Sequence, residues 1–229
     1  FTVIYGGEHA SGTTHNALIV FKDGTYLELL ALTGKSADPQ SDAVDFSPLL
    51  ATGEGFVGYA LGADDLEAAT VAMAGRVKGT VSSPQPGQRQ RADGVTLAWK
   101  TVSVSGSMSP FFLEDVTDRT LRVPDDAEIT THENGAVGIS AVTFNFADVN
   151  EAAARYTALI GIDPQPTDHG LMIQLGRTRL LLNPEGDGGD KATAPPYRLL
   201  IATSKAERTG LIRMDQAHGA RLLLTDAGH

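Results

Sequence analysis

Short segments in which apolar and polar residues alternate recur along this chain, and they predict β-strands. Residues 1–5 and 15–31 predict three strands, and Lys22-Asp23-Gly24 has the composition of the turn between the last two. The other predicted strands, in chain order, cover residues 56–61, 95–104, 111–115, 136–147, 170–175, 178–183, 197–202 and 220–224.

Two segments have the features of helices instead. Residues 64–74 begin with acidic residues and Asp64 is suited to cap the first turn, while residues 148–160 end at a glycine. Polar stretches rich in proline or glycine, over 33–48 and 184–196, predict loops.

The predicted elements repeat, which favours an α+β fold. Two hairpins end in the same aromatic-Leu-Glu sequence, at Glu28 and at Glu114. Units of strand, helix and three strands then pack as curved mixed sheets around a cavity. We expect residues 1–123 to form one pair of units, the first incomplete at its N-terminus. Residues 132–229 are expected to form a second pair, a third unit and a partial fourth.

The two glutamates are the most informative polar residues in these strands. Alternation places Glu28 on one strand face with Tyr26 and Leu30, where a charge needs a partner. If the duplicated units face each other, Glu28 and Glu114 converge in one cavity. The alternative is that each forms a structural ion pair with Arg89 or Arg91.

A glycine-rich loop near the N-terminus holds two candidate histidines. An imidazole of His9 or His15 can bind a metal or transfer a proton near neutral pH, or it can simply be exposed. Gly6, Gly7 and Gly12 either allow a ligand to approach closely or relieve backbone strain.

Composition excludes several classes of function. The net charge of −10 and a pI near 4.9 argue against nucleic-acid binding. The absence of cysteine excludes disulfides, thiolate metal sites and a cysteine nucleophile. Apolar runs are shorter than the roughly 18 residues of a membrane span. We expect a soluble, cytoplasmic protein whose partner is a small molecule.

Several motifs together resemble the glyoxalase-like domain branch of the vicinal oxygen chelate (glyoxalase/bleomycin resistance/dioxygenase) superfamily. They cover most of residues 1–135, and beyond that the resemblance is to a generic βαβββ unit. The motifs are Gly6-Gly7-x-His9-x-x-Gly12-Thr13-x-x-Asn16, Asp23-Gly24-Thr25-Tyr26-Leu27-Glu28-Leu29, Arg89-x-Arg91-x-Asp93-Gly94-x-x-Leu97-x-Trp99, Pro110-Phe111-Phe112-x-Glu114 and His132-x-Asn134-Gly135.

This resemblance implies paired βαβββ units and, in many members, one divalent metal bound by residues of the first and last strands of each unit. It points to Glu28 and Glu114 as ligands of Zn, Mg, Mn or Fe, and His9, His15 or a residue upstream of this sequence would have to add to them. Members without a cofactor exist. We expect the first strand of the first unit to lie outside this sequence. Exchange of units in a homodimer could supply it, or the strands near 197–202 and 220–224 could take its place.

The expected function is that of a lyase or isomerase acting on a small oxygenated or carbonyl-bearing metabolite. Glu28 or Glu114 would be the general base, with a pKa raised by burial, and His9 or Arg91 would stabilise an oxyanion. A metal-free binding protein is the alternative, and a purely structural domain is a third. The predicted substrate-binding residues are Arg89, Arg91, Asn16, Trp99 and Phe112, of which the two aromatic residues can equally belong to the core.

Overall fold

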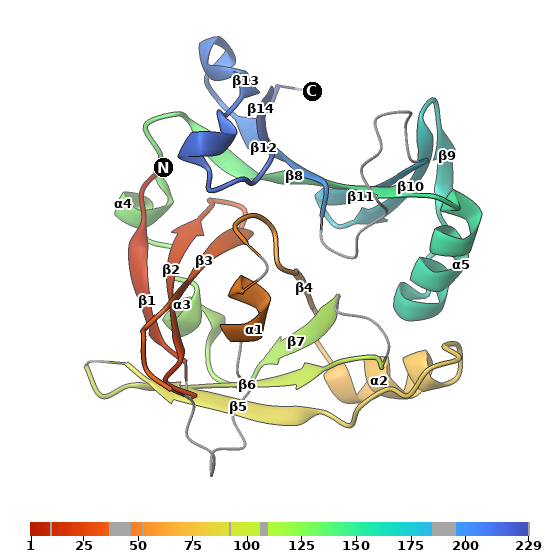
Figure 1. The fold of residues 1–229 in the computed structure, drawn as a ribbon, viewed down its shortest axis with the longest axis horizontal. Helices are drawn as coiled ribbons and strands as arrows, with labels where there is room; N and C mark the ends of the chain where they lie inside the picture. The colour runs from red at the N-terminus through yellow and green to blue at the C-terminus, as the bar shows by residue number, and fades with distance from the viewer. Residues whose placement is uncertain are drawn as a thin grey trace.

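The computed structural model describes residues 1–9, 11–36, 47–51, 53–91, 93–105, 110–184 and 196–228. Strands within these residues form three sheets of three, four and seven strands, with short helices beside them (Figure 1). The chain therefore has an α+β fold with mixed sheets. The predicted loops over 33–48 and 184–196 fall largely outside the described residues.

The first sheet is antiparallel, with the order β1 (Ile4–Glu8), β2 (Thr14–Val20) and β3 (Tyr26–Leu32). Leu18 is paired with Glu28 and Ile19 with Leu27, so the two members of each pair project from the same face. Because side chains alternate along a strand, Glu28 and Leu27 lie on opposite faces of this sheet.

The second sheet has the order β4-β7-β6-β5. Helix α2 (Leu66–Ala74) packs against it through the buried Leu66 and Met73. Its N-cap is Asp65 rather than the predicted Asp64, because the Asp65 carboxylate accepts a hydrogen bond from the Ala68 amide. The strands are β4 (Ala60–Gly62), β5 (Gln85–Gln90), β6 (Thr96–Val102) and β7 (Phe111–Asp115).

The third sheet has the order β13-β14-β12-β8-β11-β10-β9 and contains the second half of the chain. Helix α5 (Val149–Ile160) is capped by Asp148 and ends at Gly161, which is left-handed with φ 80°. The strands are β8 (Ala136–Phe146), β9 (Gln165–Thr167), β10 (Gly170–Leu175), β11 (Thr178–Pro184), β12 (Arg198–Thr203), β13 (Gly210–Leu211) and β14 (Leu222–Asp226).

Two segments share one connectivity. In β4-α2-β5-β6-β7 and in β8-α5-β9-β10-β11, the first strand pairs in parallel with the last, and the other two follow in antiparallel order. β12 pairs with β8 and β14 pairs with β12, so the C-terminal strands extend the third sheet. The expectation that they complete the first unit is therefore wrong.

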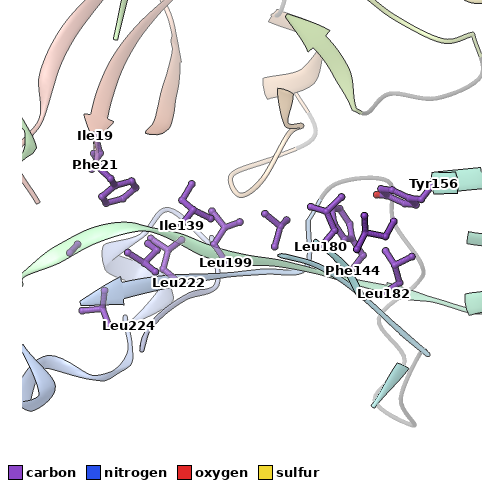
Figure 2. Close-up of a cluster of buried hydrophobic side chains, with 14 residues drawn as sticks. Ile19, Phe21, Ile139, Phe144, Tyr156, Leu180, Leu182, Leu199, Leu222 and Leu224 are labelled. Carbon is purple, nitrogen blue, oxygen red and sulfur yellow. The ribbon is translucent and has the colours of Figure 1, made fainter. Parts of the chain in front are cut away.

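The main hydrophobic core joins the first sheet to the third (Figure 2). Ile19 and Phe21 of β2 and its turn reach the strands that carry Ile139, Leu199 and Leu222. The following turn also docks on β8, where Gly138 leaves room for the Asp23 carboxylate. A side chain at Gly138 would occupy the same space, so the glycine allows this close approach.

The other face of the first sheet is covered by the segment that links the two halves of the chain. Leu18 and Val20 pack against Val123 and Ile129 of this segment. The segment contains α3 (Arg119–Arg122) and α4 (Ala127–Thr130), and the remaining short helices are α1 (Ser47–Leu50), η1 (Ala206–Arg208) and η2 (Met214–Gln216). Glu28 therefore faces the linking segment, and Leu27 faces the third sheet.

Among the helices in the described ranges, none has the length and hydropathy of a membrane span.

Candidate active site

A bulge in β1 creates the space that the site occupies. Its pairing with β2 shifts between Tyr5 and Gly7, and Gly7 has φ 129°. A β-carbon on Gly6 would lie 1.9 Å from the Asn16 Oδ1 atom, and one on Gly7 would lie 2.6 Å from Arg89 Nη1. The two glycines therefore admit one amide and one guanidinium against the backbone of β1.

Glu28 is held by two neighbours on the first sheet. Asn16 Nδ2 donates a 2.6 Å hydrogen bond to Glu28 Oε1, and His9 Nε2 lies 3.3 Å from the same oxygen. His9 Nδ1 is in turn 2.8 Å from the Thr14 hydroxyl. Asn16 is buried, while the Glu28 side chain is 38% exposed. The structure thus brings together three predicted site residues, with the carboxylate accessible.

The pKa of Glu28 is shifted in the direction opposite to the expected one. Burial alone raises it, but the hydrogen bonds from His9 and Asn16, together with the charges of His9 and Arg122, outweigh burial and lower it below its ordinary value. The expectation of a raised pKa is therefore wrong for Glu28. The group is a carboxylate at neutral pH.

Arg89 on β5 lies across the gap left by the bulge. Its Nη1 atom is buried and has no hydrogen-bond partner among the residues that the structure describes. Burial lowers the pKa of Arg89 and the charge of Glu28 opposes that shift, and a guanidinium remains protonated in proteins. The site thus contains a cation with an unused donor near the Glu28 carboxylate.

Arg122 and Asp115 form an ion pair that the sequence did not reveal. Arg122 Nε and Nη2 donate to the two Asp115 oxygens at 2.6 and 2.9 Å, and Nη1 donates to the Tyr26 hydroxyl at 2.8 Å. Both charged side chains are buried, at 11% and 12% exposure. Burial alone would lower the pKa of Arg122, but the hydrogen bonds to Asp115 and Tyr26 raise it above the ordinary value. The signal available in the sequence was Glu28 itself, which needed a cation nearby.

A pocket of about 400 Å³ lies beside these residues, between β1, β5 and the linking segment. Three arginines, Arg89, Arg91 and Arg122, contribute to its lining, together with Gly6 and Gly7. The remaining lining residues are Ile4, Tyr5, Leu18, Gln90, Asp93, Leu121, Pro124 and Ile129.

The structure places Glu114 and Phe112 away from Glu28. Glu114 Oε2 accepts a 2.7 Å hydrogen bond from the Leu66 amide at the start of α2, and Phe112 packs with Leu66 in the core beneath that helix. The neighbouring Asp115 projects from the other face of β7 and contacts Arg122. The expected convergence of Glu28 and Glu114 is not seen, because the Glu114 carboxylate instead accepts a hydrogen bond from a free backbone amide at the N-terminus of α2.

Other predicted residues occupy the surroundings of the site. Arg91 pairs with Asp93 at 2.7 Å. Trp99 is paired with Asp115 across β6 and β7 and so shares its face. His15 projects from the face of β2 opposite to that of Asn16, with its ring 6.0 Å from that of Tyr5.

The His132-x-Asn134-Gly135 motif has a structural role. His132 is buried; its Nδ1 accepts a hydrogen bond from the Thr2 amide, and its Nε2 lies 3.1 Å from the Val20 carbonyl oxygen. Asn134 Oδ1 accepts a hydrogen bond from the Ala136 amide at the start of β8. These residues brace the junction between the linking segment and the first sheet.

The side chains that the structure describes do not form a metal site. In the described part of the chain, no three His, Asp or Glu side chains come together as a group that could hold a metal. Of the predicted ligands, His9 and Glu28 do meet, but they contact each other and Glu114 is bonded to α2. Two donors fall short of the three that catalytic sites use, so no step below passes through a metal.

Comparison with known proteins adds a family to this geometry. A sequence model of the glyoxalase-like domain matches residues 1–160. No curated protein matches the chain. A crystal structure of a hypothetical protein from Staphylococcus aureus aligns with 98% of this chain and 90% of its own, with a TM-score of 0.73 and 15% identity. That likeness concerns the fold alone.

Two further structures align over a smaller part of the chain. Both are variants of Streptomyces coelicolor methylmalonyl-CoA epimerase in complex with 2-nitronate-propionyl-CoA. They cover 41% of this chain at TM-scores of 0.31 and 0.30, with 12% and 14% identity, and this chain covers 99% and 96% of theirs. Similarity this low carries no argument about the site.

Proposed function

The chain belongs to the glyoxalase-like domain family, and from that premise we propose that it is an enzyme of the lyase or isomerase type. Its substrate would be a small oxygenated or carbonyl-bearing metabolite bound between sheets of paired βαβββ units, as in the vicinal oxygen chelate fold. A fold does not determine a reaction. Support therefore comes from the residues around Glu28.

The observation that carries this proposal is the state of the Glu28 carboxylate. Its Oε1 atom is engaged by Asn16 and His9, whereas its Oε2 atom accepts no hydrogen bond within the described ranges. The group is ionised and accessible, which is what a general base requires. Glu28 would accept through Oε2 a proton from the carbon next to the substrate carbonyl.

The substrate itself would strengthen this base. A carboxylate with a lowered pKa is a weak acceptor, because the best base has a pKa near the working pH. A negative charge that develops on the substrate beside Glu28 and Arg122 disfavours the ionised form of Glu28 and so raises its pKa. Proton affinity would thus increase once the substrate is bound.

Arg91 would stabilise the intermediate. When Glu28 removes the proton, the electron pair of the broken C–H bond forms a C=C bond, and the carbonyl π pair moves to the oxygen to give an enolate. Arg91 lines the pocket beside Arg89, and a guanidinium is suited to stabilise that oxyanion. Return of the proton to the same carbon gives epimerisation, and return to a neighbouring atom gives isomerisation.

Proton exchange tests this proposal whatever product the reaction forms. The protein is incubated in D₂O with a panel of small 2-oxo and 2-hydroxy carbonyl compounds, and loss of the proton next to the carbonyl is followed by NMR. Wild-type protein and Glu114→Gln should catalyse exchange of at least one compound, and Glu28→Gln should not. Exchange that persists in Glu28→Gln would overturn the role of Glu28.

A binding protein without a metal is the second candidate. It is favoured by the lowered pKa of Glu28, because a carboxylate with a lowered pKa is a weak proton acceptor. In that case compounds from the panel would bind, and Glu28 would only orient them. Binding with no exchange in the wild-type protein would establish this alternative.

A further inference from the structure

The pocket beside β1 has two chemically different walls. The lining includes the apolar residues Ile4, Leu18, Leu121 and Ile129 and the three arginines. Its volume of about 400 Å³ is in the range of small-molecule sites. A ligand that suits both walls has an anionic group and a short apolar body.

The charges in this pocket are unevenly compensated. Arg122 is bonded through two nitrogens to Asp115, and Arg91 is paired with Asp93. Within the described ranges Arg89 has no carboxylate at ion-pair distance, and its buried Nη1 donates no hydrogen bond. Among the three arginines that line the pocket, Arg89 is therefore the one without a carboxylate partner in the described part of the chain.

The backbone of β1 makes room for that guanidinium. Gly7 has a positive φ and would place a β-carbon 2.6 Å from Arg89 Nη1. Keeping a buried donor without a partner reduces stability. An apolar side chain at position 89 would make the folded protein more stable than this arginine does. The presence of the arginine therefore favours a role in ligand binding.

We propose that this pocket binds a monocarboxylate with a short apolar body, and that the carboxylate is bound by Arg89. The inference rests on the proposed function, since the carboxylate would belong to the substrate whose reacting carbon lies near Glu28. Arg89 has no ion-pair partner within the described ranges and can match one negative charge, whereas a phosphate carries up to two charges and would leave one unmatched. Guanidinium and carboxylate geometry also permits two parallel hydrogen bonds.

Titration calorimetry and amide NMR with three probes test this assignment. The probes are hexanoate, hexan-1-ol and hexyl phosphate at equal ionic strength. Hexanoate should bind about tenfold more tightly than the alcohol, because a hydrogen bond between two charged groups is stronger than one to a neutral hydroxyl. Hexyl phosphate should bind no more tightly than hexanoate. The shifted amides should include those of Gly6 and Gly7.

Variants at Arg89 separate binding from structure. Arg89→Met should weaken hexanoate binding about tenfold or more, and it should raise the melting temperature of the ligand-free protein by removing an unpaired buried donor. Arg89→Lys should retain part of the affinity. Arg213→Gln, at an exposed arginine of η2's N-cap that pairs with Asp215, is the matched control and should leave binding unchanged.

Three results would overturn the assignment: equal binding of hexanoate and hexanol, undiminished hexanoate binding in Arg89→Met, or tighter binding of hexyl phosphate. Failure of the proposed function looks different. In that case hexanoate binds through Arg89, yet no carbonyl compound exchanges its proton. Conversely, proton exchange could depend on Glu28 while carboxylate binding does not depend on Arg89. That result would refute carboxylate binding by Arg89 and would still support the proposed enzyme.

Discussion

His9 Nε2 lies 3.3 Å from Glu28 Oε1, and this contact connects the glycine-rich loop to the strand that carries the carboxylate. Because the ionised Glu28 can only accept hydrogen bonds, Nε2 is the donor, and the other ring nitrogen faces the Thr14 hydroxyl. The imidazole is thereby fixed in one orientation. The pair orders the site before any ligand arrives.

The ionisation of Glu28 is the first prediction. Its carboxyl carbon should titrate below the ordinary value of 4.5, and Asn16→Ala should raise the midpoint by removing a donor. Since the pKa of the folded state is lowered, Glu28 stabilises the fold above the pKa of the unfolded chain, and this stabilisation is lost as pH falls through the lower folded value. The stability difference between wild type and Glu28→Gln should therefore shrink between pH 7 and pH 3. A midpoint above 4.5 would contradict the assignment.

The bulge glycine gives the second prediction. Gly6→Ala forces its β-carbon onto the Asn16 amide and should lower the free energy of unfolding by about 1–3 kcal/mol, the range for overpacking. It should also raise the pKa of Glu28 by displacing Asn16. Gly62→Ala is the control: Gly62 is likewise in a strand, has no positive φ and has open space around it, so its effect should stay within about 0.5 kcal/mol. Urea denaturation measures both, and equal effects would refute the argument.

A third prediction concerns Glu114. Glu114→Ala removes the charged acceptor for the Leu66 amide and should reduce stability by about 1–3 kcal/mol, with faster hydrogen exchange in α2. Glu128→Ala, at an exposed glutamate in the first turn of α4, should change stability by about 0.5 kcal/mol or less. Loss of substrate proton exchange in a well-folded Glu114 variant would return this residue to the active site.

The fourth prediction compares two ion pairs. Asp115→Asn leaves the buried Arg122 without its counter-charge and should cost about 3–5 kcal/mol of stability. Asp215→Asn breaks an exposed pair with Arg213 and should cost about 1 kcal/mol or less. Thermal and chemical denaturation should give this ranking, and the reverse order would show that Arg122 is compensated in another way.

His132 gives a prediction about pH. Burial lowers its pKa below the ordinary 6.5, although the hydrogen bond to the Val20 carbonyl opposes that shift. The unfolded chain then binds the proton more readily than the fold, so stability should decline as pH falls below about 6.5. His132→Phe should be less stable at pH 7.5 and should depend less on pH between 7.5 and 5.5. His218→Gln, at an exposed histidine, should keep the wild-type dependence; if His132→Phe keeps it too, another group is responsible.

The strands that the sequence revealed are those with alternating apolar residues. β2, β3, β6, β8 and β11 have such a pattern, whereas β5 (Gln85–Gln90) has Pro86 as its one apolar side chain and shows none. β9 and β13 are too short to display alternation. Tertiary pairing, which local pattern does not encode, produces these three strands.

The site was only partly predictable for a similar reason. His9, Asn16, Glu28, Arg89 and Arg91 stood out by residue type in or beside strands. Arg122 and Asp115 did not, because Arg122 lies in a segment without periodicity and Asp115 lies one position beyond the glutamate that the repeat emphasised. Adjacent residues on a strand project from opposite faces. The repeated aromatic-Leu-Glu sequence therefore led us to expect Glu114 on the face toward the site, where the structure has Asp115.

Gly6 and Gly7 have a consequence for recognising related sites in other sequences. The space that side chains at these positions would need is occupied by the Asn16 amide of β2 and the Arg89 guanidinium of β5, which lie far apart along the chain. The diagnostic feature is thus a combination: two adjacent glycines, an asparagine on the next strand and an arginine in a later polar hairpin. A relative with the glycines but an apolar residue in place of the arginine would keep this architecture without the group that we propose to bind a carboxylate.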